Sequence, residues 1–199
     1  MKISASIFTI IFFAVAFVIV LSSCSASIPD FKILTTTNPE WLIAKEDSLL
    51  QAFPNNEDLT QALVAAHLAQ GETAFRAGDW DRALVQFQRV TTLAPHNKEG
   101  RYGQALSNGR KFFKKGGSGD LWEAIIKFGE AAVIDTAQGE PNYWLARSYE
   151  KKDENDFELI VEAYDKALSK HLTPDLKKEA EEARAVVVHR REIYEAFWK

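Results

Sequence analysis

The amino-acid sequence predicts an all-α protein, a solenoid in which antiparallel helix pairs stack side by side. Beyond residue 38, apolar residues recur at the three- and four-residue spacing of amphipathic helices. Gly78, Ala83 and Phe87 also have counterparts of the same type 41 positions later. A fixed period of about 20 to 50 residues is typical of stacked supersecondary units.

The N-terminus has the organisation of a secretory signal. Lys2 is followed by residues 3–21, which carry no charge, and then by small residues before Cys24. This order predicts a signal peptide over residues 1–23. An uncleaved transmembrane anchor is the alternative, because 19 uncharged residues approach the roughly 20 that a spanning helix needs. Both place the remaining chain outside the cytoplasm, since Lys2 holds the N-terminus inside.

The run Leu21-Ser22-Ser23-Cys24 resembles the lipobox of bacterial lipoproteins. The resemblance implies that the Cys24 thiol is lipidated and that Cys24 becomes the acylated first residue of a membrane-anchored protein. Ser25 stands where an aspartate would suggest retention in the inner membrane, so the resemblance implies the outer membrane of a host with two membranes. Residues 24–38 lack a helical period, and we expect them to form a lipidated tether.

Composition indicates a single acidic domain. Removing residues 1–23 leaves 176 residues with 23 basic and 28 acidic side chains, a net charge of −5. A chain of this charge has no electrostatic basis for binding nucleic acid. Cys24 is the only cysteine, so the domain has no internal disulfide and depends on its apolar core.

The first predicted helix covers residues 39–53. Asn38 is a suitable N-cap and Pro39 suits the first helical position. Pro54 ends the helix.

The clearest helix pair spans residues 64–97. Gly78 and Asp79 form its turn, and the Asp79 side chain can cap the second helix. The positions expected to pack the two helices, or to end the second, are Gly71, Ala83, Phe87, Val90 and Pro95.

Two further pairs follow. The second has helices over residues 98–115 and 121–134, joined by a glycine-rich turn at 116–119. The third begins near Pro141, and an acidic loop at 153–156 separates its two helices.

The unit resembles the tetratricopeptide repeat (TPR), a helix–turn–helix of about 34 residues with alanine, phenylalanine and proline at set positions. The resemblance implies a TPR-like array over residues 39–172, with about three repeats preceded by a half repeat. The period of 41 exceeds the family's by two helical turns, which predicts that the first helices of the first two units are about 10 Å longer than usual. In the second unit, the glycine-rich turn is an alternative place for part of this excess.

Residues 173–199 are predicted to form a C-terminal capping helix that starts at Thr173-Pro174. End repeats need a cap with a polar outer face. The alternative is docking onto a partner or a second copy of the chain, because Phe197 and Trp198 lie at the extreme terminus. A homo-oligomer formed through this helix is therefore possible.

No catalytic, cofactor or metal signature is present in the sequence. Its four histidines lack the i, i+4 spacing of a helical zinc site, and no G-x-S-x-G nucleophile motif occurs. We therefore predict no enzyme activity, no cofactor and no metal.

The TPR resemblance implies a scaffold that binds envelope proteins or peptides through its concave, first-helix surface. Tyr143 and Arg147 share one helix face, and tyrosine and arginine concentrate binding energy. Both are expected to be free of packing roles. The alternative is an accessory lipoprotein that holds a small ligand, or a solute-binding protein, for a transporter. The candidate groove residues are Glu72, Arg76, Tyr102, Tyr143 and Arg147.

Overall fold

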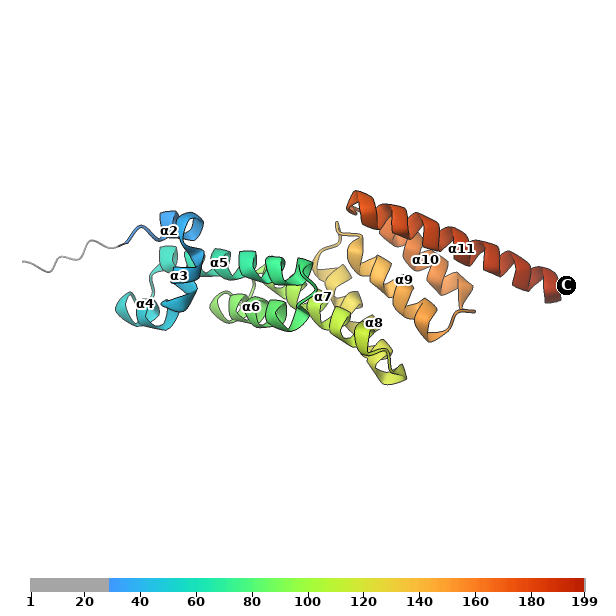
Figure 1. Ribbon diagram of the computed structural model, residues 1–199, viewed down its shortest axis with the longest axis horizontal. Helices are drawn as coiled ribbons and strands as arrows, with labels where there is room; N and C mark the ends of the chain where they lie inside the picture. The colour runs from blue at the N-terminus through green and yellow to red at the C-terminus, as the bar shows by residue number, and fades with distance from the viewer. Residues whose placement is uncertain (1–28, 199) are drawn as a thin grey trace, which may run out of the picture.

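The computed structural model describes residues 29–198, and this part of the chain is helical almost throughout (Figure 1). The signal peptide predicted over residues 1–23 and the lipidation site Cys24 lie outside the described residues. The described helices are α2 (Phe31–Thr37), α3 (Pro39–Ala44), α4 (Glu46–Ala52), α5 (Glu57–Arg76), α6 (Trp80–Leu93), α7 (Lys98–Lys115), α8 (Ser118–Ile134), α9 (Glu140–Lys152), α10 (Phe157–Leu168) and α11 (Pro174–Trp198). The all-α prediction is confirmed.

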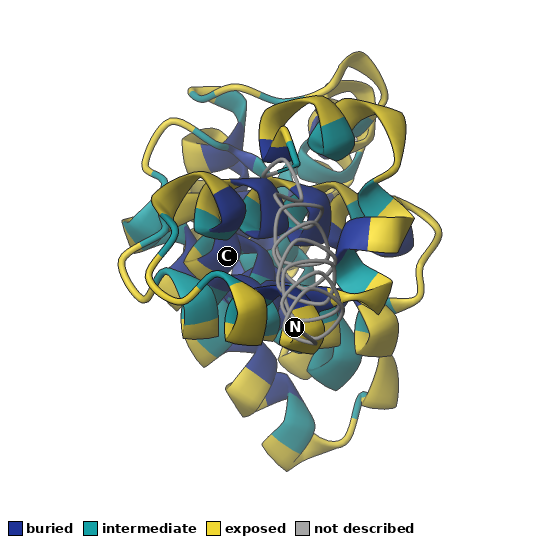
Figure 2. Cartoon of the chain, turned by 90° about the vertical axis from the view of Figure 1, so that its left-hand side faces the viewer, coloured by how far each residue is buried: buried dark blue, intermediate teal, exposed yellow. Residues whose placement is uncertain are grey.

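From α5 onward, each helix packs most closely on its neighbours in the chain. The pairs α5–α6, α7–α8 and α9–α10 follow one another along an elongated row, and α11 packs on α10 (Figure 1). Seen from the α4 end, the buried stretches of the helices face inward and the exposed stretches lie outside (Figure 2). The core is therefore a row of clusters between successive helices.

Helix ends follow the local signals closely. The Asp79 side chain accepts a hydrogen bond from the Arg82 N–H at 3.1 Å, which caps α6 as predicted. The predicted bounds of α7 agree with the structure. The glycine turn is shorter than predicted, because Gly116 has the left-handed φ of 72° that ends α7, and α8 already begins at Ser118.

Two predictions for the N-terminal region are wrong. The expected tether over residues 24–38 contains α2, which packs on α5. Asp30 caps this helix, and the Phe31 ring is buried against Phe53 with 5.5 Å between ring centroids. The single helix expected over residues 39–53 is two helices, interrupted at Lys45.

Close approach of α5 and α7 depends on glycines that face the Phe87 ring. A Cβ added at Gly71 would lie 2.8 Å from this ring, and one added at Gly103 would lie 2.6 Å from it. Real Cβ atoms do not approach so closely, so the ring fills the space that the missing side chains leave. Phe128 meets Gly109 in the same way, at 2.5 Å. Aromatic rings of second helices thus insert into gaps on first helices.

The C-terminal helix is only partly packed. Ala180 and Val187 of α11 are fully buried against the preceding pair. Its last two turns expose Ile193, Phe197 and Trp198. Within residues 29–198, no helix is both long and apolar enough to cross a membrane.

The glycine contacts generate a first prediction. Gly103→Ala should lower the free energy of unfolding by about 1–3 kcal/mol, because the added methyl group overpacks Phe87. Gly129→Ala is the matched control, since a Cβ on this helical glycine meets nothing within 4 Å. The control should be neutral or gain up to about 1 kcal/mol of helix propensity. Urea unfolding measures both, and equal effects would contradict the contact.

Candidate binding groove

A groove of about 480 Å³ lies between α5, α7 and the start of α9. Apolar side chains from α5, α6 and α7 form much of its wall. The polar lining comes from α5, α7, the residues around the α8–α9 connection and the residue before α11. The apolar members are Leu68, Phe75, Phe87 and Leu106. The polar members are Glu72, Arg76, Lys98, Glu99, Tyr102, Asp135, Gln138, Glu140 and Thr173.

Three of the five predicted groove residues meet in this groove. Glu72 and Arg76 form an ion pair along α5 at 2.9 Å, with side chains that are 53% and 77% exposed. Tyr102 is half-buried on α7 and lines the same groove. The rim of the groove is therefore open to solvent, while its wall is apolar.

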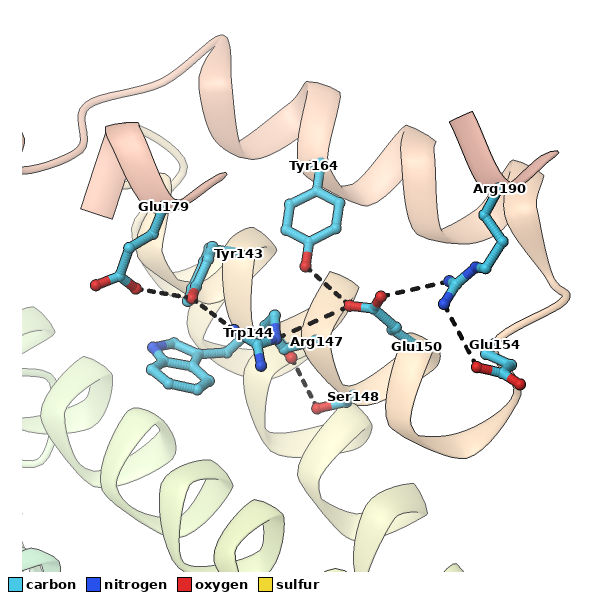
Figure 3. A network of polar contacts seen from close by, with 9 residues as sticks. All are labelled: Tyr143, Trp144, Arg147, Ser148, Glu150, Glu154, Tyr164, Glu179 and Arg190. Atoms are coloured by element: carbon cyan, nitrogen blue, oxygen red, sulfur yellow. Dashed lines mark hydrogen bonds and ion pairs between the residues drawn. The ribbon is translucent and has the colours of Figure 1, made fainter. Parts of the chain in front are cut away.

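The structure contradicts the prediction that Tyr143 lies free in the groove. It also places Arg147 outside the groove, in a hydrogen bond with Tyr143. Tyr143 is 1% exposed and belongs to the core of the third helix pair. Its hydroxyl donates a hydrogen bond to Glu179 of α11 at 3.0 Å and accepts one from Arg147 Nη1 at 3.1 Å (Figure 3). Neither residue lines the groove, and Tyr143 is needed for packing.

Both residues belong to a polar network that joins α9, α10 and α11 (Figure 3). Glu150 of α9 accepts a hydrogen bond from the Tyr164 hydroxyl at 3.3 Å and another from Arg190 of α11 at 3.3 Å. Arg190 also reaches Glu154 at 3.4 Å. These contacts cross three helices, so the network fixes how α11 docks on the third pair.

The error over Tyr143 has a structural cause. Tyr143 and Tyr102 are 41 positions apart and therefore occupy equivalent places in successive units. Helix α11 covers Tyr143 and supplies the Glu179 acceptor, whereas Tyr102 remains half-buried and has no hydrogen-bond partner for its hydroxyl within residues 29–198. A repeat pattern does not show which unit the terminal helix covers.

Sequence reasoning missed two charged residues beside the groove, Glu140 and Arg110. The Arg110 guanidinium of α7 stacks on the Trp144 ring, 3.7 Å from its centroid, and one of its nitrogens lies 3.7 Å from a Glu140 oxygen. The Trp144 indole N–H donates to Glu140 at 3.1 Å. The position of Glu140 in the sequence could have drawn attention to it, because Glu140 directly precedes the proline that opens the third unit.

The surroundings of Glu140 disfavour the charged form of its carboxylate. Burial raises the pKa of Glu140, although the Trp144 N–H and Arg110 both favour its charged form. Burial also raises the pKa of Tyr102, and the negative charges of Glu140 and Asp135 add to that effect. Glu140 and Asp135 therefore place negative charge near the Tyr102 hydroxyl.

No described residues group as a metal site: residues 29–198 contain no cluster of three or more histidine, cysteine, aspartate or glutamate side chains placed to hold an ion. A comparison with protein-family models finds none that matches the chain.

The burial of Tyr143 predicts large effects on stability. Tyr143→Ala should lower the free energy of unfolding by about 3–5 kcal/mol, because it leaves a cavity in the core. Tyr143→Phe should cost only about 0.5–1.5 kcal/mol for each hydrogen bond it removes. Denaturant unfolding followed by circular dichroism measures the series. An unchanged midpoint for the alanine variant would place this residue at the surface.

The raised pKa of Glu140 predicts a stability that depends on pH. The folded state holds the Glu140 proton more tightly than the unfolded state does, so the contribution of Glu140 to stability is lost as pH rises from the ordinary glutamate pKa of 4.5 through the raised value. Glu140→Gln lacks this titration and can still accept from Trp144. The variant should therefore be more stable than the parent at about pH 7, and the difference should shrink towards pH 4.5.

Exposed Glu99 is the control for that comparison. Glu99→Gln should change the free energy of unfolding by less than about 0.5 kcal/mol at either pH. A Glu140→Gln variant that is less stable than the parent at about pH 7 would show that the carboxylate is stabilising.

Proposed function

We propose that this protein is a lipid-anchored, extracytoplasmic TPR-like scaffold that binds another envelope protein in the groove between α5, α7 and α9. The observation that carries the proposal is the groove itself, which combines an apolar wall with an open polar rim. Protein-binding surfaces have this combination of an apolar centre and a polar rim.

The helix arrangement supports the TPR-like part of the proposal. Three helix pairs follow one another, and their first helices begin at residues 57, 98 and 140, which is close to the 41-residue period. The first helices α5 and α7 contain 20 and 18 residues. The groove lies mainly along these first helices, as the resemblance implies. Helices α2, α3 and α4 pack against α5 in the place of the proposed half repeat, and α11 packs on α10 as a cap.

The anchor and the location rest on the N-terminal sequence. In this proposal Cys24 carries lipid, the tether is shortened to the residues before α2, and the domain faces the periplasm or the cell surface at the outer membrane. Several acyl chains give firm anchoring, since each buried CH₂ contributes about 0.8 kcal/mol. A fixed tether would keep the groove close to partners in the envelope.

The ligand-carrier alternative is less well supported. That function favours an enclosed apolar pocket, whereas the side chains of Glu72 and Arg76 are mostly exposed at the rim of an open groove. An open groove suits an extended segment or a helix of another protein.

Photo-crosslinking in the native host tests the binding function. A benzoylphenylalanine in place of the exposed groove residue Glu99 should form a covalent adduct with one defined partner. The same group in place of Glu123, exposed on α8 and outside the groove, is the control and should not form that adduct. Adducts of equal yield from both positions, or none from position 99, would contradict the proposal.

The anchor has its own test. Cys24→Ser should leave an unlipidated precursor that retains Met1, because lipidation and signal cleavage depend on the thiol. Intact-mass spectrometry of membrane fractions detects both the missing lipid and the retained Met1. Parent protein that keeps Met1 and a free thiol would rule out the lipoprotein.

A further inference from the structure

The Tyr102 end of the groove resembles a binding site that is missing its positive partner. The lining of the whole groove includes four carboxylates, Glu72, Glu99, Asp135 and Glu140, against two cations, Arg76 and Lys98. Two of them are paired within the groove, Glu72 with Arg76 at 2.9 Å and Asp135 with Lys98 at 3.0 Å. Glu99 has no ion pair within residues 29–198, and Glu140 has only Arg110, whose nearest nitrogen is 3.7 Å away.

Arg110 compensates Glu140 incompletely. The guanidinium is held by rings of three other helices, with the Trp80 and Trp144 ring centroids at 4.8 and 3.7 Å and Phe75 at 5.9 Å. Its Nε is buried and has no hydrogen-bond acceptor in the described chain. Stacking thus fixes Arg110 between the units and prevents it from approaching the carboxylate as a bidentate partner.

The equivalent position in the next unit shows what a complete arrangement looks like. There the Tyr143 hydroxyl donates to Glu179 and accepts from the Arg147 guanidinium, so tyrosine, carboxylate and cation are joined. At the groove, the tyrosine and the carboxylate are present as Tyr102 and Glu140, but no described cation reaches the Tyr102 hydroxyl.

Building on the proposed function, we propose that the groove binds a segment of a partner protein in which a lysine or arginine lies next to an apolar side chain. The cation would sit between Glu140 and the Tyr102 ring, with Glu99 at the rim. The apolar side chain would lie against Leu68, Phe75 and Leu106. A cation is attracted both by carboxylates and by the face of an aromatic ring, and desolvation strengthens both attractions. Burial is the main cause of the raised pKa of Tyr102, and the negative charges of Glu140 and Asp135 add to it, which agrees with a site for a cation beside this tyrosine.

Peptide selection tests the charge of the partner. The probe is a phage library of random twelve-residue peptides, selected on the full chain purified in a mild nonionic detergent. Selected peptides should carry lysine or arginine within two positions of an apolar residue. Replacing that basic residue by norleucine should weaken binding by about tenfold or more, and raising salt from about 50 to 500 mM should also weaken it.

Matched variants locate the site. A double variant with Glu99→Gln and Glu140→Gln should bind the selected peptides about tenfold or more weakly than the parent protein does. Glu123→Gln with Glu181→Gln makes the same change in net charge at two exposed positions outside the groove and should change affinity less than about twofold. Selection of acidic or uncharged peptides, failure to select any peptide, or equal weakening by both pairs of variants would overturn the inference.

The proposed binding function and the proposed basic segment can be rejected independently of each other. Crosslinking from position 99 reports whether the groove contacts a partner, whatever the charge of that partner. An adduct from position 99 together with acidic selected peptides would leave the binding function intact and reject the basic segment.

Discussion

The insertion of the Phe87 ring between Gly71 and Gly103 is the contact on which the rest of the structure depends. One ring meets the first helix of its own unit and the first helix of the next, so it sets the spacing of α5 and α7 together. Phe87 and Gly103 also line the groove. The packing contact that joins the first two units therefore also shapes the surface proposed to bind a partner.

The junction between the second and third units uses a different contact. Trp144 lies 41 positions after Gly103, and its ring stacks on Phe128 with centroids 6.2 Å apart and planes inclined by 25°. A large ring thus replaces the glycine gap at the equivalent position. The same tryptophan stacks on Arg110 and donates to Glu140. The tryptophan at this position thus contacts both Arg110 and Glu140.

Much of the fold could be predicted from the sequence because its signals are local and repeated. Asp79, Gly71 and Phe87 mark a turn and a helix crossing by residue type and spacing, and the structure confirms each role. Helix α2 was missed because its seven residues are too few to show a period, and its stability comes from burying Phe31 against distant residues. Local patterns do not reveal such tertiary contacts.

The groove could be predicted only in part. Glu72, Arg76 and Tyr102 were identified because they lie on first helices, but Tyr143 was placed at the surface although α11 covers it. The face that α11 covers depends on where the array of helix pairs ends. No residue within the repeated unit indicates that position. Glu140 was missed because its significance lies in incomplete charge compensation, which becomes visible only when Arg110 and Trp144 are placed around it. A carboxylate that lines a groove and has only a distant cation for a partner is the kind of feature that indicates a functional site.

A double-mutant cycle between Phe87 and Gly103 tests most directly whether this contact sets the helix spacing. Gly103→Ala is measured by urea unfolding in the parent and in Phe87→Leu, whose smaller side chain leaves room for the added methyl group. If the ring occupies the glycine gap, the alanine should cost at least about 1 kcal/mol less in the leucine background. Effects that add to within about 0.5 kcal/mol would mean that Phe87 and Gly103 do not touch, and would contradict the account of both the junction and the groove.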